Sequence, residues 1–448
     1  MRSAAASTTG AAPAHAVERL SFGEALSFWV RLGFVNFGGP AGQIAIMHRE
    51  LVERRRWIGE GAFLRGLNFC NLLPGPEAQQ LATYVGWRLH GIPGGIAAGT
   101  FFVVPSVFVL LALSWLAVAH GEVPWVSGLL YGVQPVVVAV VLAAVVRIGR
   151  RTLHHPVLLA IAVLSFVAIL LLRVPFPAVV LAAGLIGLAL QRSYPDAFRA
   201  PEHGDGQGTD DRTQPEPDHD DVEPSLRRAV RIALVCLVLW AMPVGALMLW
   251  RGPGDVLVRE ALFFTQAAFV TFGGAYAVLA YIAEQAVNTY GWLEPDQMAQ
   301  GLGLAESTPG PLIMVTQYVG FVGAWRHAGP HPPFLNGVLG GLITTYVTFL
   351  PSFMLIFLGA PHIEALGRDR RIAGALAGVT AAVVGVIANL GVFFGGHVLV
   401  RNGHLDAFAS VLALASFVAI WRFHVPIYLA VPAGALLGMV WRLSGLAS

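Results

Sequence analysis

Two Pro-Gly-Pro tripeptides, at residues 74–76 and 309–311, are the features of this sequence best suited to chemistry. Each one interrupts an apolar run. A helix cannot pass through such a tripeptide unbroken, because proline lacks a backbone donor and clashes with the preceding turn. The helix that restarts after the break presents unpaired N–H groups and the positive end of its dipole. This arrangement predicts an oxyanion-binding site, and such a site does not need a positively charged side chain.

Two Phe-Gly-Gly sequences, Phe37-Gly38-Gly39 before Pro40 and Phe272-Gly273-Gly274, predict a second pair of breaks. Hydrogen-bonding side chains gather beside all four breaks, where an apolar background makes them costly. The expected substrate-binding residues are Asn36, Gly38, Gly39, Gln43, Asn68, Pro74, Gly75, Pro76, Gln79, Gln80, Gly273, Gly274, Thr308, Pro309, Gly310, Pro311 and Gln317. The alternative is that the polar groups among them only cap half-helices and satisfy one another.

A few charged residues lie near the same breaks. Arg31 and Arg88 are expected to bind substrate, because a guanidinium can hold a tetrahedral oxyanion with two parallel donors. They could equally extend to the membrane interface or pair with Glu24 or Glu77. Glu77 and Glu306 flank the Pro-Gly-Pro breaks and are candidates to carry a proton coupled to anion movement. Glu77 could instead only stabilise the first turn of its half-helix.

The composition fits neither a metal site nor a redox centre. The two cysteines, Cys70 and Cys236, have no CxxC or Cys/His spacing. Seven histidines fall in predicted loops, namely those at 154, 155, 327, 331, 397, 404 and 424. We therefore expect no metal, no cofactor and no enzymatic activity, and a membrane reductase is disfavoured.

Hydrophobic residues make up 56% of the chain and charged residues only 12%, against roughly 25% charged in soluble domains. The apolar runs that approach or exceed the ~20 residues needed to cross a bilayer are 94–119, 125–146, 232–250, 334–359 and 372–394. These features predict an all-α polytopic membrane protein. The basic residues are all arginines and cluster in predicted loops, among them Arg147, Arg150 and Arg151.

The breaks recur at a constant spacing, since 272−37 = 292−57 = 309−74 = 235, with Trp57 matched by Trp292. The chain is therefore expected to be a duplication. Its expected parts are a tail (1–20), a first repeat (21–191), an acidic cytoplasmic linker without regular structure (192–231), an extra helix (232–250) and a second repeat (251–448).

Charge predicts how the two repeats are oriented. The loop around residues 48–56 is strongly basic, whereas its counterpart at 284–296 has three acidic residues and no arginine. By the positive-inside rule the repeats lie antiparallel in the bilayer, as inverted-topology repeats. Every basic cluster falls inside if segments 21–47 and 62–90 enter the membrane and return to the same side. We therefore favour two re-entrant hairpins plus four spanning helices per repeat over an all-spanning arrangement with locally kinked helices.

The combination of motifs resembles the chromate ion transporter family. The residues that carry the resemblance are Phe37-Gly38-Gly39-Pro40, Trp57, Leu73-Pro74-Gly75-Pro76, Gln79, Gln80, Tyr84, Gly86, Gly94-Gly95 and Pro105-Ser106, with second copies at 272–274, 292, 309–311, 318–320, 340–341 and 351–352. The second copy departs from the first, because Ala275 replaces Pro40 and no arginine matches Arg31 or Arg88. The two halves are therefore not expected to contribute equally to the site.

The resemblance implies the long, two-domain form of that family, which exports chromate from the bacterial cytoplasm using the membrane potential or the proton gradient. We therefore expect a secondary transporter in the bacterial inner membrane that confers chromate resistance. Its expected partners are a chromate or sulfate-like dianion and membrane lipid, with no nucleic acid, and a homodimer is left open. The alternatives are a transporter of sulfate or another oxyanion, and a passive anion channel.

Overall fold

The computed structural model describes residues 20–194, 225–363, 370–401 and 403–445. The expected N-terminal tail and the centre of the acidic linker lie outside these residues. The first half consists of α1 (Phe22–Val35), α2 (Gly39–His48), the π-helical η1 (Arg49–Arg54), α3 (Glu60–Leu72), α4 (Glu77–Ala119), α5 (Pro124–Thr152), α6 (Pro156–Leu170) and α7 (Phe176–Leu190).

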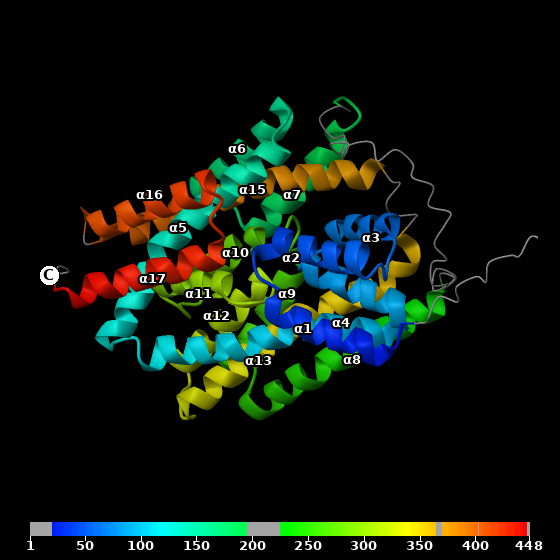
Figure 1. Cartoon of the computed structure of the whole chain (residues 1–448), viewed down its shortest axis with the longest axis horizontal. Coiled ribbons are helices and arrows are strands. Elements are labelled where there is room, and N and C mark those ends of the chain that lie inside the picture. The colour runs from blue at the N-terminus through cyan, green and yellow to red at the C-terminus, as the bar shows by residue number, and fades with distance from the viewer. Residues whose placement is uncertain (1–19, 195–224, 364–369, 402, 446–448) are drawn as a thin grey trace, which may run out of the picture.

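The second half begins with α8 (Leu226–Arg251), which has no counterpart among the described elements of the first half, and then follows a similar order of elements (Figure 1). It continues with α9 (Val256–Val270), α10 (Ala275–Ala283), η3 (Glu284–Thr289), α11 (Pro295–Ser307), η4 (Leu312–Met314), α12 (Val315–Arg326), α13 (Pro333–Gly359), η5 (Ala360–His362), α15 (Arg370–Val398), β1 (Val400–Arg401), β2 (His404–Leu405), α16 (Ala407–Arg422) and α17 (Ile427–Leu443). The two strands form one antiparallel pair.

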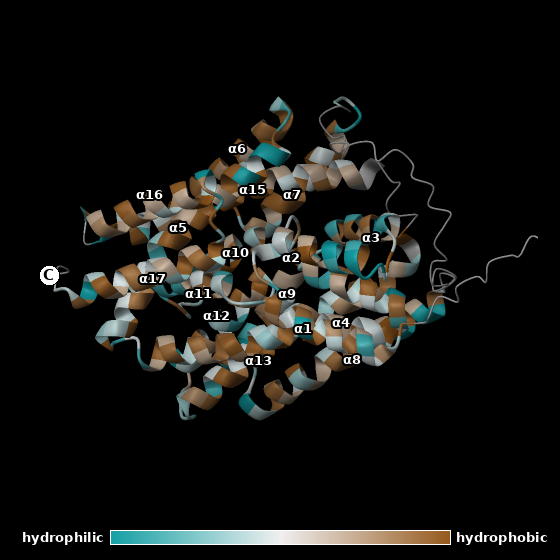
Figure 2. Cartoon of the chain, viewed as in Figure 1, coloured by the Kyte–Doolittle hydropathy of each residue, from teal (hydrophilic) through white to brown (hydrophobic). Residues whose placement is uncertain are grey.

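All five long apolar runs are helical. Within the described residues, α4, α5, α8, α13 and α15 are long and apolar enough to cross a membrane. Figure 2 shows hydrophobic residues along α8, α13 and α16, and hydrophilic ones gathered on α3. Much of α8 is exposed although it is apolar, as expected for a helix that faces lipid. The expected all-α polytopic membrane class is confirmed.

All four expected breaks are present. The chain leaves helical geometry between α1 and α2, between α3 and α4, between α9 and α10, and between α11 and η4. With 14 and 10 residues, α1 and α2 are about 21 and 15 Å long, so neither alone reaches across the ~30 Å hydrocarbon core. Whether these interrupted segments cross the membrane or re-enter it remains a prediction.

The two halves exchange their packing partners. α5 of the first half packs along α16 and α17 of the second, and α15 of the second half packs along α6 and α7 of the first. α4 packs against α1, and the matching α12 and α13 pack against α9. These reciprocal contacts are those that a duplicated chain would make. The antiparallel orientation of the repeats remains a prediction.

Three expectations about basic residues and histidines need correction. Arg147, Arg150 and Arg151 are not in a loop but in the last turns of α5. α8 begins at Leu226 rather than at 232, so it takes in three arginines expected in the linker. Arginine is a good helix former and its long stem packs on apolar surface, so a drop in hydropathy did not mark the helix ends. His397 likewise lies in α15 and His404 in β2.

Candidate functional site

The breaks of the two halves are joined to each other. The Gly75 N–H donates to the Thr271 carbonyl over 2.9 Å, and the Gly310 N–H donates to the Asn36 carbonyl over 2.9 Å. Each Pro-Gly-Pro break therefore binds the Phe-Gly-Gly break of the other half. Both bonds satisfy backbone groups that the interrupted helices leave unpaired. The result is two similar half-sites at the junction of the two halves of the chain.

The first half-site contains no charged group, and we call it the neutral half-site: Asn36, Gly38, Gly39, Ser106 and Gly310. Gln43 of α2 links the two breaks of this half-site, since its Nε2 donates a hydrogen bond to the Gly310 carbonyl over 2.6 Å. Ser106 of α4 packs directly on Gly310, because a Cβ added to Gly310 would lie 2.9 Å from its Oγ. The Asn36 amide and the Ser106 hydroxyl are buried and have no hydrogen-bond partner among the described residues.

Unpaired buried donors are unusual, because burying a polar group without a partner costs free energy. The Thr316 hydroxyl, in the first turn of α12, is also buried and unpaired within the described part of the chain. Three side chains near one break can thus each offer a donor to a bound group. A ligand rich in acceptor oxygens matches this set.

The helices that begin at the breaks add backbone donors. α2 and η4 start after Gly38 and Pro311, and neither start is capped by a side chain. A Cβ added to Gly39 would meet nothing within 4 Å. Space is therefore open beside Gly39, the first residue of α2, near a helix start whose dipole favours an anion.

The second half-site carries charge, and we call it the acidic half-site: Gly75, Glu77, Thr271, Gly274 and Ser352. Ser352 packs on Gly75 as Ser106 packs on Gly310, with its Oγ 2.8 Å from the position of an added Cβ. The Glu77 carboxylate oxygens lie 3.6 and 3.8 Å from the position of a Cβ on Gly274. A carboxylate thus occupies the place that is open in the neutral half-site.

The two half-sites differ because of a single aligned position. Residue 312 matches residue 77, since 312−77 = 235, and the second repeat has Leu312 where the first has Glu77. Glu306 adds to the acidic side, because it accepts a hydrogen bond from the Tyr276 hydroxyl in the first turn of α10. A dianion is repelled by ionised carboxylates at one half-site and not at the other.

Two arginines that sequence reasoning placed only in a basic loop approach the acidic half-site. Arg147 hydrogen-bonds to Tyr276 and attracts Glu306 electrostatically. Arg151, one turn further along α5, attracts Glu77. Both guanidinium groups lie on exposed residues. They provide positive charge between solvent and the breaks, which their position at a helix end did not reveal in the sequence.

The expected arginines lie in different surroundings. Arg31 is exposed on α1, and no described contact brings it to the breaks. Arg88 is 3% exposed, and its Nη1 donates to the Tyr84 hydroxyl over 3.3 Å. Neither residue has a described contact with the half-sites.

Several other predicted site residues hydrogen-bond to other groups of the chain rather than face open space. Gln80 donates to the Pro74 carbonyl, and Gln317 donates to the Val107 carbonyl of α4. Gln79 donates to Thr83, and Thr308 to the Ala305 carbonyl. Asn68 is exposed on α3. Apart from Asn68, these residues make contacts of the kind that the capping alternative describes, and their role in substrate binding stays a prediction. Among the break glycines, a Cβ added to Gly39 is the one that would meet nothing within 4 Å.

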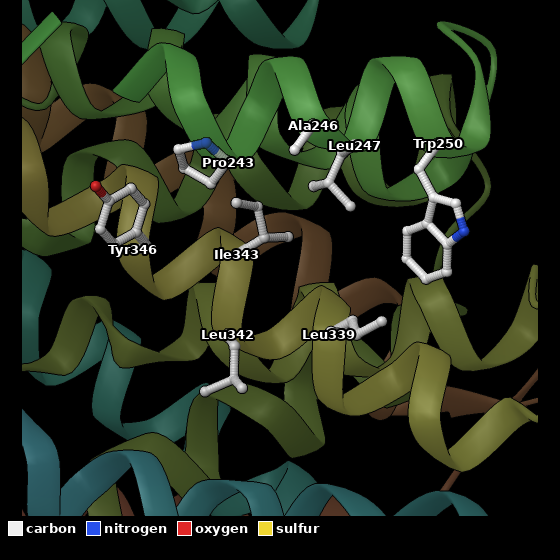
Figure 3. A pocket seen from close by; sticks show the side chains of 8 residues that line it. All are labelled: Pro243, Ala246, Leu247, Trp250, Leu339, Leu342, Ile343 and Tyr346. Carbon is white, nitrogen blue, oxygen red and sulfur yellow. The ribbon is translucent and has the colours of Figure 1, made fainter. Parts of the chain in front are cut away.

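A groove of about 690 Å³ lies elsewhere, between α8 and α13 (Figure 3). Its lining is apolar and consists of Pro243, Ala246, Leu247, Trp250, Leu339, Leu342, Ile343 and Tyr346. No arginine or amide lines it, so it does not suit an oxyanion. Among the described residues, no cluster of three His, Cys, Asp or Glu side chains suits a metal ion.

Comparisons with known proteins agree with the motifs. The family model described as "Chromate transporter" matches residues 23–188 and 259–439. The chain is 26% identical over 432 residues to a probable chromate transport protein of Synechococcus elongatus, covering 96% of each chain. It is 27% identical over 435 residues to the chromate transport protein of Cupriavidus metallidurans, covering 97% of this chain and 96% of that one.

A chromate transport protein of Pseudomonas aeruginosa is 29% identical over 424 residues, covering 94% of this chain and 92% of its own. No solved structure is significantly similar to this chain.

Proposed function

Because the chain belongs to the chromate transporter family, we propose that it is a secondary active transporter that exports chromate across the bacterial inner membrane and confers chromate resistance. The relatives named as chromate transport proteins support chromate as the substrate. The observation that carries the proposal is the neutral half-site, where two buried donors without a described partner belong to the same junction as an uncapped helix start with open space at Gly39.

A tetrahedral dianion fits this half-site by chemistry. Its four oxygens accept hydrogen bonds from the Asn36 amide, the Ser106 hydroxyl and the backbone N–H groups that begin α2. Hydrogen bonds to a charged acceptor are worth about 1.5–3 kcal/mol each, more than those between neutral groups. Arg147 and Arg151 attract the anion towards the breaks from the exposed end of α5. Movement of one repeat against the other would then alternate access to the two sides.

The functional test measures radiolabelled chromate and sulfate in proteoliposomes with imposed pH and voltage gradients. A secondary transporter accumulates chromate against its gradient. Flux that only equilibrates chromate, whatever gradient is imposed, would identify a passive channel instead. Sulfate is nearly isosteric with chromate and serves as the competitor that measures selectivity.

Replacing Ser106 with alanine is expected to weaken chromate binding about tenfold or more. The hydroxyl is buried and unpaired in the neutral half-site, so its loss removes a hydrogen bond to a charged group, and every 1.4 kcal/mol is a factor of ten. The measurement is the KM for chromate in proteoliposomes. Ser352→Ala is the matched control, since Ser352 occupies the equivalent place against Gly75. Equal KM values for the two variants would contradict the assignment of the anion to one half-site.

We also propose that Glu77 and Glu306 transfer the coupled proton at the acidic half-site. The variant Glu77→Gln keeps the size of the side chain and removes the titration. It is expected to lower chromate accumulation driven by a pH gradient at least tenfold, while chromate–chromate exchange stays within twofold of the native rate. Loss of both activities would assign Glu77 to substrate binding, and retention of both would remove it from coupling.

A further inference from the structure

Glu260 is a buried carboxyl group that belongs to neither half-site. It lies in the second turn of α9, with 0% of its surface exposed. Among the described residues, neither Oε1 nor Oε2 has a hydrogen-bond partner. An ionised carboxylate held this way, without a donor or a counter-charge, is strongly disfavoured. A neutral, protonated carboxyl group is tolerated far better.

Two glycines make room for this carboxyl group. A Cβ added to Gly323 of α12 would lie 2.6 Å from Oε1, and a Cβ added to Gly340 of α13 would lie 2.9 Å from Oε2. Either contact is too close for a real side chain. The carboxyl group therefore fills a slot between α9, α12 and α13 that exists only because both residues lack a side chain.

The first repeat builds the same helix crossing without a carboxyl group. Gly86 and Gly94 approach each other there as Gly320 and Gly340 do in the second repeat. The position that matches Glu260 is Ala25, since 260−25 = 271−36 = 235, and the one that matches Gly323 is Leu89, since 323−89 = 320−86 = 234.

Ala25 is buried, and Leu89 packs against the same hydrophobic cluster. An apolar pair is therefore sufficient for packing at this crossing. In the second repeat, Glu260 and Gly323 stand in place of this apolar pair. The need to fill the core does not explain the carboxyl group, because an apolar side chain would fill the same space at a lower cost in free energy.

Several charged and titratable groups of the surrounding helices make hydrogen bonds or ion pairs with residues other than Glu260. The elements packed against α9 are α8, α10, α12 and α13. Their charged and titratable groups, with those of α9 itself, are Arg227, Arg228, Arg231, Cys236, Arg251, Asp255, Arg259, Tyr276, Tyr281, Tyr318, Arg326, His327 and Tyr346. Arg251 donates to Asn336 from Nη2, while its Nε and Nη1 have no described partner; Arg326 pairs with Glu294, and His327 hydrogen-bonds to the Gly323 carbonyl. Asp255 caps the N-terminus of α9, and the Tyr276 hydroxyl donates a hydrogen bond to Glu306. No described cation neutralises Glu260.

Glu260 lies near one end of the bundle. Gly340 is seven residues, or about 10 Å, along α13 from Pro333, and Gly323 is in the last turn of α12. Exposed Arg326 and His327 follow directly. The predicted topology places this end of the bundle on the outer side of the membrane, opposite the cytoplasm. The reason is that α8 starts at the cytoplasmic linker, crosses the membrane and ends at Arg251.

We propose that Glu260 is a proton-binding site that takes up a proton from the outer side and releases it inward during each transport cycle. In uptake, hydronium gives its proton to Oε2, an O–H bond forms, and water leaves. In release, water takes the proton and the carboxylate returns. The occupant is a proton rather than a metal cation, because the slot offers one carboxyl group and no second oxygen-bearing side chain among its glycine walls. The inference rests on the proposed transport function.

The experiment compares Glu260→Gln with the native protein in proteoliposomes, under an imposed pH gradient and in chromate–chromate exchange. Exchange is expected to stay within twofold of the native rate, while accumulation driven by the pH gradient falls at least tenfold. Glu24→Gln is the matched control, because Glu24 is an exposed carboxylate at nearly the same place in the first repeat. It is expected to behave as the native protein does.

Native accumulation by Glu260→Gln would overturn the proposal, and so would accumulation that follows a sodium gradient in the native protein. Infrared difference spectroscopy of the native protein, compared between acidic and alkaline buffer, tests whether Glu260 binds a proton and does not depend on a transport assay. A protonated-carboxyl C=O band that responds to pH and disappears in Glu260→Met supports the site, and its absence overturns it. A native protein that exchanges no chromate but shows the band would refute the proposed function and leave the proton site standing.

Discussion

Replacing Gly310 with alanine is expected to reduce chromate transport at least 100-fold. The Gly310 backbone has φ of +113°, which an L-residue rarely adopts, and an added Cβ would lie 2.7 Å from the Ser106 Cβ. Relief of that contact must move the break away from α4, which lengthens the bond from the Gly310 N–H to the Asn36 carbonyl. The same movement separates the donors of the neutral half-site. Both binding and the junction of the repeats are therefore affected.

Initial rates of chromate uptake into proteoliposomes test this prediction, with protein amount and monodispersity checked for each variant. Gly329→Ala is the control for backbone strain alone, since Gly329 also has a positive φ of +58° but open space around it. It is expected to retain transport. Gly75→Ala is expected to be as damaging as Gly310→Ala, because Gly75 makes the equivalent bond to Thr271. Native transport by Gly310→Ala would show that the break is not a fixed part of the site.

Replacing Leu312 with glutamate is expected to weaken chromate binding at least 100-fold. Leu312 aligns with Glu77 of the other repeat, and the space beside Gly39 is open, so the new carboxylate is expected to approach Gly39 as Glu77 approaches Gly274. A single negative charge about 5 Å from a dianion costs about 7 kcal/mol at an effective dielectric constant of 20. Protonation of the new carboxyl group relieves part of this repulsion. The loss should therefore grow as the pH rises.

Chromate binding to purified protein, measured by titration calorimetry at two pH values, checks the effect. Leu312→Gln is the matched control, because it has the same shape without the charge, and Leu312 is only 3% exposed. It separates repulsion from poor packing. If the glutamate and glutamine variants lose affinity equally, the loss comes from packing, and the anion is not held beside Leu312.

Much of this arrangement could be predicted from the residues alone. Proline and glycine act on the backbone locally, so the four breaks and the long apolar helices were predictable within a few residues. The constant spacing of 235, which predicts a duplication, was visible in the sequence. The difference between Glu77 and Leu312 was present in the same spacing, and aligning those two positions would have revealed it.

Other features depend on long-range contacts that no local pattern encodes. The bonds from Gly75 to Thr271 and from Gly310 to Asn36 join residues about 200 or more positions apart. Ser106 becomes a site residue only because α4 passes behind Gly310, although the matching Pro-Ser pairs at 105–106 and 351–352 were a signal that could have found it. Arg147 reaches the acidic half-site only because α5 continues past its apolar run.

The surroundings of Glu260 also could not be predicted from the sequence. Its charge in an apolar segment was visible in the sequence, but its lack of a partner was not. That property depends on the absence of side chains at Gly323 and Gly340 in two other helices. Sequence periodicity places a residue on a helix and cannot say which neighbours are missing.

The central claim is that the neutral half-site, rather than the arginines or the acidic half-site, holds the dianion. Anomalous diffraction at the chromium absorption edge, from crystals grown with chromate, locates the metal atom of the substrate directly. The account predicts a chromium peak in front of Gly38 and Gly39, within reach of Asn36 and Ser106. A peak between Arg147 and Arg151, or beside Gly274, with none at Gly39, would contradict it.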